Sequence, residues 1–325
     1  MILSTLGIDI AKQKFNVCLI QPTGKFKHKV FPNSEAGFEQ LAAWLSKHAA
    51  GYTHACMEAT GTYGEALALY IHEAGHTVSV VNPASRQSLC RQPPLTLPPT
   101  DRVDAELISR FCLAQQPARW TPLRPEVREL QALVRRLEAL VEMRVAEENR
   151  LSAGIAVAAV KASVEELLAH LCEQIKRNEE LLRAHIRSHP ELKEQSRLLD
   201  SIPGIGETTA ATLLAEITDI KQYRSARQVA AFAGLVPRER SSGSSVRGRV
   251  RLSKIGNSRL RRALYFPAVT VLRCSPFFQQ WAAGLRERGK SKMSVIGAVM
   301  RKLIHLAYGV LKTGKPFDPQ WVKSA

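Results

Sequence analysis

Residues 6–31 read LGIDIAKQKFNVCLIQPTGKFKHKVF, in which three short apolar or alternating runs are separated by polar residues. Runs of this length that are rich in Ile, Val and Phe predict β-strands, and Pro22 and Gly24 indicate a turn between the second and the third. We therefore expect an antiparallel meander. Its strands should span residues 6–10, 15–20 and 25–31.

Helix and strand patterns alternate after the meander. We expect a capped helix over about residues 34–47, a strand that ends at Glu58, a helix over about 63–73 and a strand over 77–81. A proline-rich stretch then leads into a helix that begins near Asp101. Three antiparallel strands followed by this alternation favour an α/β layer of the RNase H type.

The remainder of the chain has a helical pattern. Leucines at a and d spacing follow a group of prolines near residue 120, and a second apolar helix extends past residue 180, which predicts a helical hairpin. A narrow apolar seam with charged flanks favours self-association over contact within one chain only. The region from residue 193 reads as helical, with a Gly-, Ser- and Arg-rich loop at 238–249. The expected domains are residues 1–120, 121–192 and 193–325.

The excess of positive charge lies entirely in the C-terminal third of the chain. Residues 1–220 contain 24 Lys and Arg against 26 Asp and Glu, whereas residues 221–325 contain 22 against 3. Such an excess indicates a polyanionic partner, and nucleic acid is the leading candidate. A basic membrane-surface segment is the alternative, but the arginines are interleaved with Gly and Ser instead of following one helix face.

Composition indicates a folded cytoplasmic protein. The hydrophobic content of 45% over 325 residues is enough for two or three domains with cores of their own. The six cysteines form no Cys-x-x-Cys pair and no zinc-type grouping with histidine, so we interpret them as small buried residues in a reducing compartment. No apolar stretch reads as a membrane span, and we expect no membrane association.

Four acidic residues interrupt this apolar patterning. Asp9 lies inside the first strand beside the small residue Gly7, Glu58 ends a later strand, and Asp101 and Asp104 lie three residues apart at a helix start. Taken singly, each has an ordinary explanation: a solvated strand, a helix-start acid or a capping box. Together they are predicted to converge at one end of the sheet. Gathered carboxylates favour a hard divalent cation such as Mg²⁺, and hence phosphoryl-transfer chemistry.

Two further motifs point to nucleic acid. The turn over residues 202–206, IPGIG, resembles the hairpin of helix-hairpin-helix DNA-binding modules, although a plain interhelical turn explains it equally well. The segment over 240–249, RSSGSSVRGR, reads either as a flexible basic linker or as a serine nucleophile whose arginine neighbours would stabilise an attacked phosphodiester. Arg259, Arg261 and Arg262 follow and are interpreted as phosphate contacts.

These motifs resemble, in order, the DEDD-type transposases of the insertion-sequence one-ten family over nearly the whole chain. The resemblance rests on five quoted segments: Gly7-Ile8-Asp9, Glu58-Ala59-Thr60-Gly61-Thr62-Tyr63, Thr100-Asp101-Arg102-Val103-Asp104-Ala105, Ile202-Pro203-Gly204-Ile205-Gly206, and Phe232-Ala233-Gly234-Leu235-Val236-Pro237 followed by Ser242-Gly243-Ser244-Ser245-Val246-Arg247-Gly248. The chain departs from the family pattern at Pro98-Pro99, where the family tends to have a basic residue.

The resemblance implies a RuvC-like N-terminal domain, a coiled-coil middle and a C-terminal transposase domain that contributes a nucleophilic serine. By position, Asp9, Glu58, Asp101 and Asp104 would hold Mg²⁺, and Ser242, preferred over its neighbour Ser241, would form a covalent phosphoserine link to DNA. The family also implies a tetramer formed as a dimer of dimers, and a structured bridge RNA that pairs with donor and target DNA. Expected nucleic-acid-binding residues are Gly204, Gly206, Arg247, Arg249, Arg251, Lys254, Arg259, Arg261 and Arg262.

Two alternatives remain open at the level of sequence. A RuvC-like junction endonuclease would hydrolyse DNA with metal-activated water and form no covalent intermediate. A helix-hairpin-helix binding protein would perform no chemistry.

Overall fold

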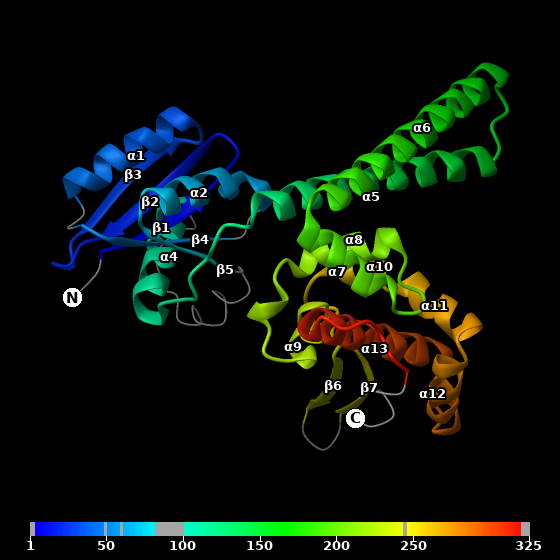
Figure 1. The fold of residues 1–325 in the computed structure, drawn as a ribbon. Coiled ribbons are helices and arrows are strands. Elements are labelled where there is room, and N and C mark those ends of the chain that lie inside the picture. Colours follow the sequence, from blue (N-terminus) through cyan, green and yellow to red (C-terminus); the bar gives the residue numbers. More distant parts are fainter. Residues whose placement is uncertain (1–3, 49–50, 59–60, 82–100, 243–245, 320–325) are drawn as a thin grey trace. The chain divides into compact units, whose positions relative to one another are not determined.

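The computed structural model describes residues 4–48, 51–58, 61–81, 101–242 and 246–319 (Figure 1). The chain forms two compact units, Met1–Pro122 and Leu123–Ala325, which are considered separately below. The proline-rich stretch before Asp101, together with Cys90, lies outside the described residues. The three-part division expected from sequence stays a prediction.

The N-terminal unit is built on a five-stranded mixed sheet with the order β3-β2-β1-β4-β5. Its strands are β1 Ser4–Ile10, β2 Lys14–Ile20, β3 Phe26–Pro32, β4 Thr53–Glu58 and β5 Thr77–Val81. The first three strands pair antiparallel, which confirms the predicted meander, whereas β4 and β5 run parallel to β1 and to each other. The α/β class of RNase H type is confirmed.

Helices cover both faces of this sheet (Figure 1). They are α1 Glu35–His48, α2 Glu65–Glu73 and α4 Asp101–Gln115, with a short 3₁₀ turn η1 at Gly61–Gly64. The buried side chains of α1 and α2 pack with Phe15 and Phe31 on one face, where these two rings stack with centroids 5.5 Å apart. On the opposite face, α4 packs against β1, β2 and β4.

Gly7 allows α4 to approach the sheet closely. A Cβ added at this position would overlap the Ala105 carbonyl oxygen and the Ser109 backbone nitrogen. Ser109 also donates its hydroxyl to the Thr5 carbonyl oxygen at 3.2 Å, which joins the helix to β1. The helix therefore lies directly on the backbone of β1.

Replacing Gly7 with alanine is expected to lower the free energy of unfolding of the N-terminal unit by at least about 2–3 kcal/mol, because backbone atoms of α4 would have to move. Thermal unfolding measures this change. Gly284→Ala is the control, because that glycine has open space around it and alanine favours helix. Equal stability of Gly7→Ala and wild type would show that α4 does not lie this close to β1.

The C-terminal unit is mostly helical. Its helices are α5 Pro125–Ser152, α6 Ala158–Ser188, α7 Pro190–Asp200, α8 Glu207–Ile217, η2 Ile220–Gln222, α9 Ala226–Phe232, α10 Ser258–Ala263, α11 Tyr265–Cys274, α12 Pro276–Glu287 and α13 Lys292–Thr313. Two strands, β6 Pro237–Ser242 and β7 Val246–Leu252, form an antiparallel hairpin. The apolar side chains of α7 to α13 and the base of α5 share one large core.

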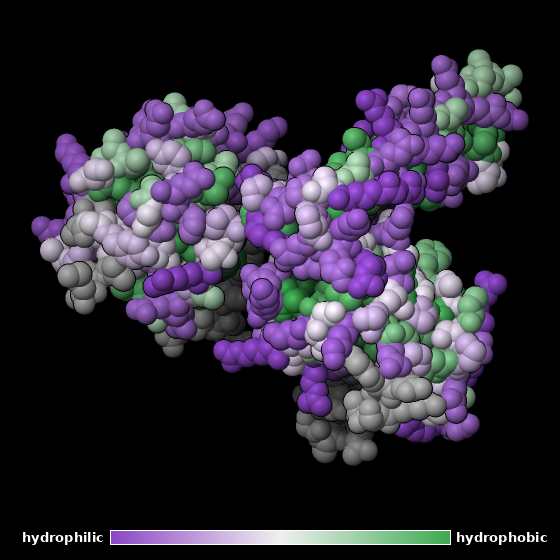
Figure 2. Space-filling model, in the orientation of Figure 1, coloured by the Kyte–Doolittle hydropathy of each residue, from purple (hydrophilic) through white to green (hydrophobic). Residues whose placement is uncertain are grey.

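The α5/α6 pair is the predicted helical hairpin. Leu137 and Leu140 of α5 pack against Leu171 and Ile175 of α6, so the apolar seam is filled within the chain. Apolar side chains remain exposed at the far end of the hairpin, where Figure 2 shows green residues and where Val157 and Val160 are exposed. Self-association through the hairpin stays a prediction.

Helix α13 has 22 residues and is long and apolar enough to cross a membrane by length and composition. The expectation that no apolar stretch is long enough to span a membrane is therefore wrong by length and composition. Half of its candidate window is buried inside the protein, and residues such as Val299, Leu303 and Ile304 belong to the core of the C-terminal unit. These contacts are those of a core helix of a globular unit.

Candidate active site

The carboxyl ends of β1 and β4 bring Asp9 and Glu58 to the same edge of the sheet. These strands are parallel, and their register pairs Ile8 with Met57, one position before the two acidic residues. Asp9 lies two positions after Gly7, and therefore on the face of β1 that α4 covers. Glu58 lies two positions after Cys56, which packs with residues of α4, so it shares that face.

Helix α4 brings Asp101 and Asp104 to the same edge. The helix runs antiparallel to β1, because Ser109 contacts Thr5 near the start of the strand whereas Asp101 contacts Asn16, the partner of Asp9 in the β1/β2 register. Both acidic residues lie in the first turn of α4. The four carboxylates predicted from sequence therefore lie at one end and on one face of the sheet.

Asp101 is held by two side chains from β2. Lys14 Nζ lies 3.0 Å from Asp101 Oδ2, and Asn16 Nδ2 donates to the same oxygen at 3.3 Å. The hydrogen bond and charge of Lys14, together with Asn16, hold the pKa of Asp101 below its ordinary value of 3.8. Neither β2 residue was expected at the site from sequence. Asn16 could have been noticed because it interrupts the apolar run Phe15-Asn16-Val17.

The four acidic residues have the donor chemistry of a metal site. Their donors are all carboxylate oxygens, which hard cations such as Mg²⁺ prefer, and the four positions share one edge and one face. Among the residues that the structure describes, no three His, Cys, Asp or Glu side chains are grouped closely enough to hold an ion. The chemistry and placement of the set therefore fit a divalent cation, although the side chains are not gathered around a common point.

The ion pair of Lys14 with Asp101 should make stability depend on pH. Because the pKa of Asp101 is lowered in the folded protein, the pair stabilises the fold above the ordinary carboxyl pKa and loses this effect as the pH falls through the lowered value. Lys14→Met should therefore reduce the free energy of unfolding at pH 7 and have little effect near pH 2. Urea titrations across pH measure the difference, with Lys12→Met as control. A difference that does not change with pH would contradict the pairing.

The predicted serine segment forms a β-hairpin instead of the expected loop. Strand β6 ends at Ser242, and β7 begins at Val246, with Ser242 opposite Val246 and Ser241 opposite Arg247. Val246, Val250 and Leu252 lie at alternate positions of β7, between arginines, and this period-two pattern favours strand pairing where Gly and Ser had indicated a loop. Ser242 thus occupies the last position of a strand, beside residues 243–245, which lie outside the described part of the chain.

The backbone pairing also locates the basic residues of β7. Arg247 pairs with Ser241, and Arg251 pairs with Arg238, while Arg249 lies between them on the same strand. Lys254 follows β7 in an exposed turn with φ of 56°. The basic residues therefore lie on β7, which pairs with β6, the strand of the predicted nucleophile.

The two glycines of the 202–206 turn differ in their environments. Gly204 has φ of 81°, and a Cβ there would overlap Val271 Cγ1 and approach the Pro267 carbonyl oxygen at 3.1 Å, so this glycine is needed for packing against α11. Gly206 has open space around it at the start of α8. Gly204 therefore has a packing role, whereas no contact in the structure requires glycine at position 206.

The arginines of α10 have partners within the C-terminal unit. Arg259 Nε donates to Glu138 Oε2 of α5 at 2.9 Å, and Arg262 pairs with Glu142 of the same helix. Arg261 Nη1 donates to the Ala233 carbonyl oxygen at 3.0 Å. Sequence analysis interpreted all three as phosphate contacts. In the structure they also hold α10 in place, so a phosphate would share or replace these partners.

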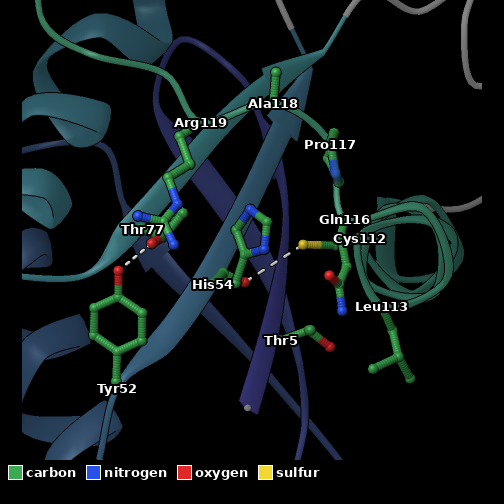
Figure 3. Close-up of a pocket in the computed structure, with 10 residues that line it drawn as sticks. All are labelled: Thr5, Tyr52, His54, Thr77, Cys112, Leu113, Gln116, Pro117, Ala118 and Arg119. Atoms are coloured by element: carbon green, nitrogen blue, oxygen red, sulfur yellow. Dashed lines mark hydrogen bonds between the residues drawn. The ribbon is translucent and has the colours of Figure 1, made fainter. Parts of the chain in front are cut away.

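A hollow of about 470 Å³ lies at the opposite end of the N-terminal sheet (Figure 3). It is lined by Thr5, Tyr52, His54, Thr77, Cys112, Leu113, Gln116, Pro117, Ala118 and Arg119. Thr5, His54 and Thr77 lie in the first halves of the parallel strands β1, β4 and β5, and the other ends of β1 and β4 carry Asp9 and Glu58. Burial and then Arg119 lower the pKa of His54, whose Nε2 lies 2.8 Å from Ser79 Oγ. This hollow is therefore separate from the candidate active site.

Comparison with known proteins identifies the class. A family model described as "Transposase IS116/IS110/IS902 family" matches residues 196–282, and a DEDD transposase model for IS110 elements matches residues 6–157. The carboxylate edge and the serine hairpin thus fall within two matched transposase regions. The protein is a DNA transposase or recombinase.

Relatives matched over most of their length show the family. The pilin gene-inverting protein of Moraxella bovis is 33% identical over 316 residues, which cover 96% of this chain and 97% of the relative. The transposase for insertion sequence element IS1328 of Yersinia enterocolitica is 28% identical over 350 residues, covering 96% and 98%. The transposase for IS1111A of Coxiella burnetii is 27% identical over 297 residues, covering 82% and 78%. The chain belongs to the IS110 family of insertion-element transposases.

Proposed function

We propose that this transposase cuts and rejoins DNA at specific sites through a covalent phosphoserine intermediate, with a guide RNA selecting the sites and Mg²⁺ bound by the acidic residues. The observation that carries the proposal is the shared edge and face of Asp9, Glu58, Asp101 and Asp104. A globular unit has little structural reason to collect four carboxylates there, because like charges repel one another.

The proposed chemistry assigns the attack to Ser242. Its hydroxyl oxygen forms a bond to phosphorus, the bond from phosphorus to the leaving sugar oxygen breaks, and the serine proton ends on that oxygen. In the second step a sugar hydroxyl of another strand attacks the phosphoserine and restores the serine hydroxyl. Both steps exchange one phosphodiester for another, so rejoining needs no external energy source. Arginines of β7, Arg247 and Arg249, would stabilise charge on the attacked phosphate.

The four carboxylates would hold the cation in this proposal. When bound, Mg²⁺ would supply positive charge to phosphate oxygens during phosphoryl transfer. Lys14 would then compete with the cation for Asp101, because its ammonium group contacts the same carboxylate. Lys14 would therefore neutralise part of the acidic charge and reduce repulsion among the carboxylates before a cation binds.

The guide RNA, the tetramer and the cytoplasmic location are parts of the proposal supported by sequence. The excess of 22 basic over 3 acidic residues after residue 220 suits a nucleic-acid partner. A tetramer, as a dimer of dimers, would allow the acidic residues of one subunit to meet the serine of another. Relatives named as gene-inverting proteins support a reaction that rejoins DNA as well as cutting it.

A denaturing gel tests the proposal. Full-length protein is incubated with Mg²⁺, its co-purified RNA and labelled DNA containing the element ends, then denatured. We expect a labelled strand that remains attached to protein, that is lost after protease treatment, and that does not form when the RNA is digested beforehand. Cleaved DNA without any attached protein would reject the phosphoserine intermediate.

A RuvC-like hydrolytic nuclease is the second candidate function. It is favoured by the fact that all four carboxylates lie in one compact unit, whereas Ser242 lies in the other. In that case the acidic residues would hold a cation that lowers the pKa of water for hydrolysis, and the C-terminal unit would only bind DNA. Oxygen-18 from water would then enter the cleaved phosphate, whereas the serine mechanism leaves rejoined products unlabelled.

Phosphate contacts by β7 should make binding sensitive to salt. The logarithm of the DNA association constant is expected to fall linearly with the logarithm of salt concentration, and Arg247→Ala should reduce the slope by about one. Fluorescence anisotropy at several salt concentrations measures both. Lys47→Ala, an exposed change on α1, is the control and should leave the slope unchanged. A slope unaffected by Arg247→Ala would remove this residue from the interface.

A further inference from the structure

Phe266 is the most exposed large apolar side chain among the described residues. Its side chain is 74% exposed, although it belongs to helix α11, whose Pro267, Ala268 and Val271 are buried. The neighbouring Tyr265 meets it edge to face, with ring centroids 5.4 Å apart and planes at 80°. An exposed aromatic ring that packs against a second ring offers a flat apolar surface on which a partner can stack.

The Phe266 ring borders a hollow that is also lined by two arginines. The hollow has a volume of about 390 Å³ and is lined by Ser258, Arg261, Arg262, Tyr265, Phe266 and Met300. Its lining contains two arginines and no acidic residue. Helices α10, α11 and α13 contribute these residues, and Figure 1 shows them together in the C-terminal unit. The hollow is large enough for a single nucleobase with its sugar.

The arginines retain donors for a ligand. Arg262 uses one nitrogen on Glu142, and 65% of its side chain is exposed. Arg261 uses one nitrogen on the Ala233 carbonyl oxygen. Because a guanidinium group carries five N–H donors, each arginine can also contact a phosphate. The hollow therefore combines apolar side chains with cationic ones.

We propose that this hollow binds one unpaired DNA base, which stacks on Phe266 while Arg261 and Arg262 contact the adjoining phosphates. A base within a duplex is already stacked on both sides and offers no free surface to the ring, so the site should select unpaired nucleotides. Phenylalanine has no hydrogen-bonding group, so selection should tolerate any base. The inference rests on the proposed function only in taking DNA as the ligand of the C-terminal unit.

Charge complementarity argues against a second copy of the chain as the occupant. Two copies that met through this face would bring Arg261 and Arg262 against the same arginines, within a region that contains 22 basic and 3 acidic residues. Like charges at close range oppose such contact. A polyanion with flat apolar bases satisfies both features of the hollow.

The test compares single-stranded and duplex DNA of one sequence. The single strand carries 2-aminopurine, whose fluorescence falls when it stacks, and affinity is measured by anisotropy with full-length protein. Phe266→Leu should weaken single-strand binding by about tenfold and abolish the quenching, while duplex affinity stays within about twofold. Phe266→Trp should retain both signals because it retains a ring. Met293 is an exposed apolar residue on a different helix, α13, and Met293→Leu should behave as wild type.

Other outcomes overturn the proposal. Equal loss on both DNA forms, or no loss on either, would show that the ring does not bind an unpaired base. A loss confined to RNA of the same sequence would assign the hollow to the guide RNA. A change in sedimentation without a change in DNA binding would assign it to a second copy. Ring-dependent quenching without any covalent adduct would instead reject the proposed function and leave the base site standing.

Discussion

Replacing Ser242 with alanine is expected to abolish the covalent protein–DNA product and to reduce strand cleavage by at least about a thousandfold. Without the hydroxyl oxygen of Ser242 no phosphoserine bond can form. Ser242 is the one nucleophile in the proposed mechanism. Wild-type affinity for DNA should be retained, because the basic residues of β7 remain. The denaturing gel measures the adduct, and anisotropy measures binding.

Ser241→Ala is the matched control for this prediction. The two serines are neighbours on β6, so the two variants make the same chemical change one position apart. Because Ser242 is the proposed nucleophile, Ser241→Ala should retain adduct formation. Adduct that disappears in Ser241→Ala and persists in Ser242→Ala would exchange the two roles.

Replacing Asp9 with asparagine is expected to reduce metal-dependent cleavage by about a thousandfold while the protein stays folded. Asparagine has nearly the shape of aspartate, but it lacks the negative charge that attracts a cation to the edge shared by β1, β4 and α4. The melting temperature should remain within about 3 °C of wild type. Activity is measured as adduct formed at increasing Mg²⁺ concentrations.

Glu73→Gln provides the control for charge removal. Glu73 is an exposed acid at the end of α2, away from the carboxylate edge, so its neutralisation should leave cleavage unchanged. If Asp9→Asn retained full activity at every Mg²⁺ concentration, the acidic edge would have no part in the reaction. If it lost activity only by unfolding, the thermal measurement would reveal that cause.

Most elements of the N-terminal unit could be predicted because their signals are local. The meander, the strand ending at Glu58 and the strand over 77–81 follow from apolar runs between turn residues. The hairpin over 238–249 was mistaken for a loop because Gly and Ser indicate turns, whereas strand pairing depends on the partner strand. A pairing of two segments cannot be recognised from either segment alone.

The candidate site shows the same division. Spacing and strand ends suggested that Asp9, Glu58, Asp101 and Asp104 would meet, and the structure confirms their common edge. The contact of Lys14 and Asn16 with Asp101 joins residues about 85 positions apart, so no local pattern contains it. Likewise, the glutamate partners of Arg259 and Arg262 lie about 120 positions earlier in the chain. The local sequence does not reveal these pairs, so it predicted phosphate contacts for both arginines.

The sequence by itself determined the kinds of element, the charge asymmetry and the acidic and serine motifs, since these depend on residue type and short spacing. Only the tertiary structure decided which face of the sheet carries the acids, which arginines pair with α5, and that Phe266 borders a basic hollow. The physical reason is that burial, ion pairing and exposure are properties of surroundings. Those surroundings exist only after segments distant in the chain have packed together.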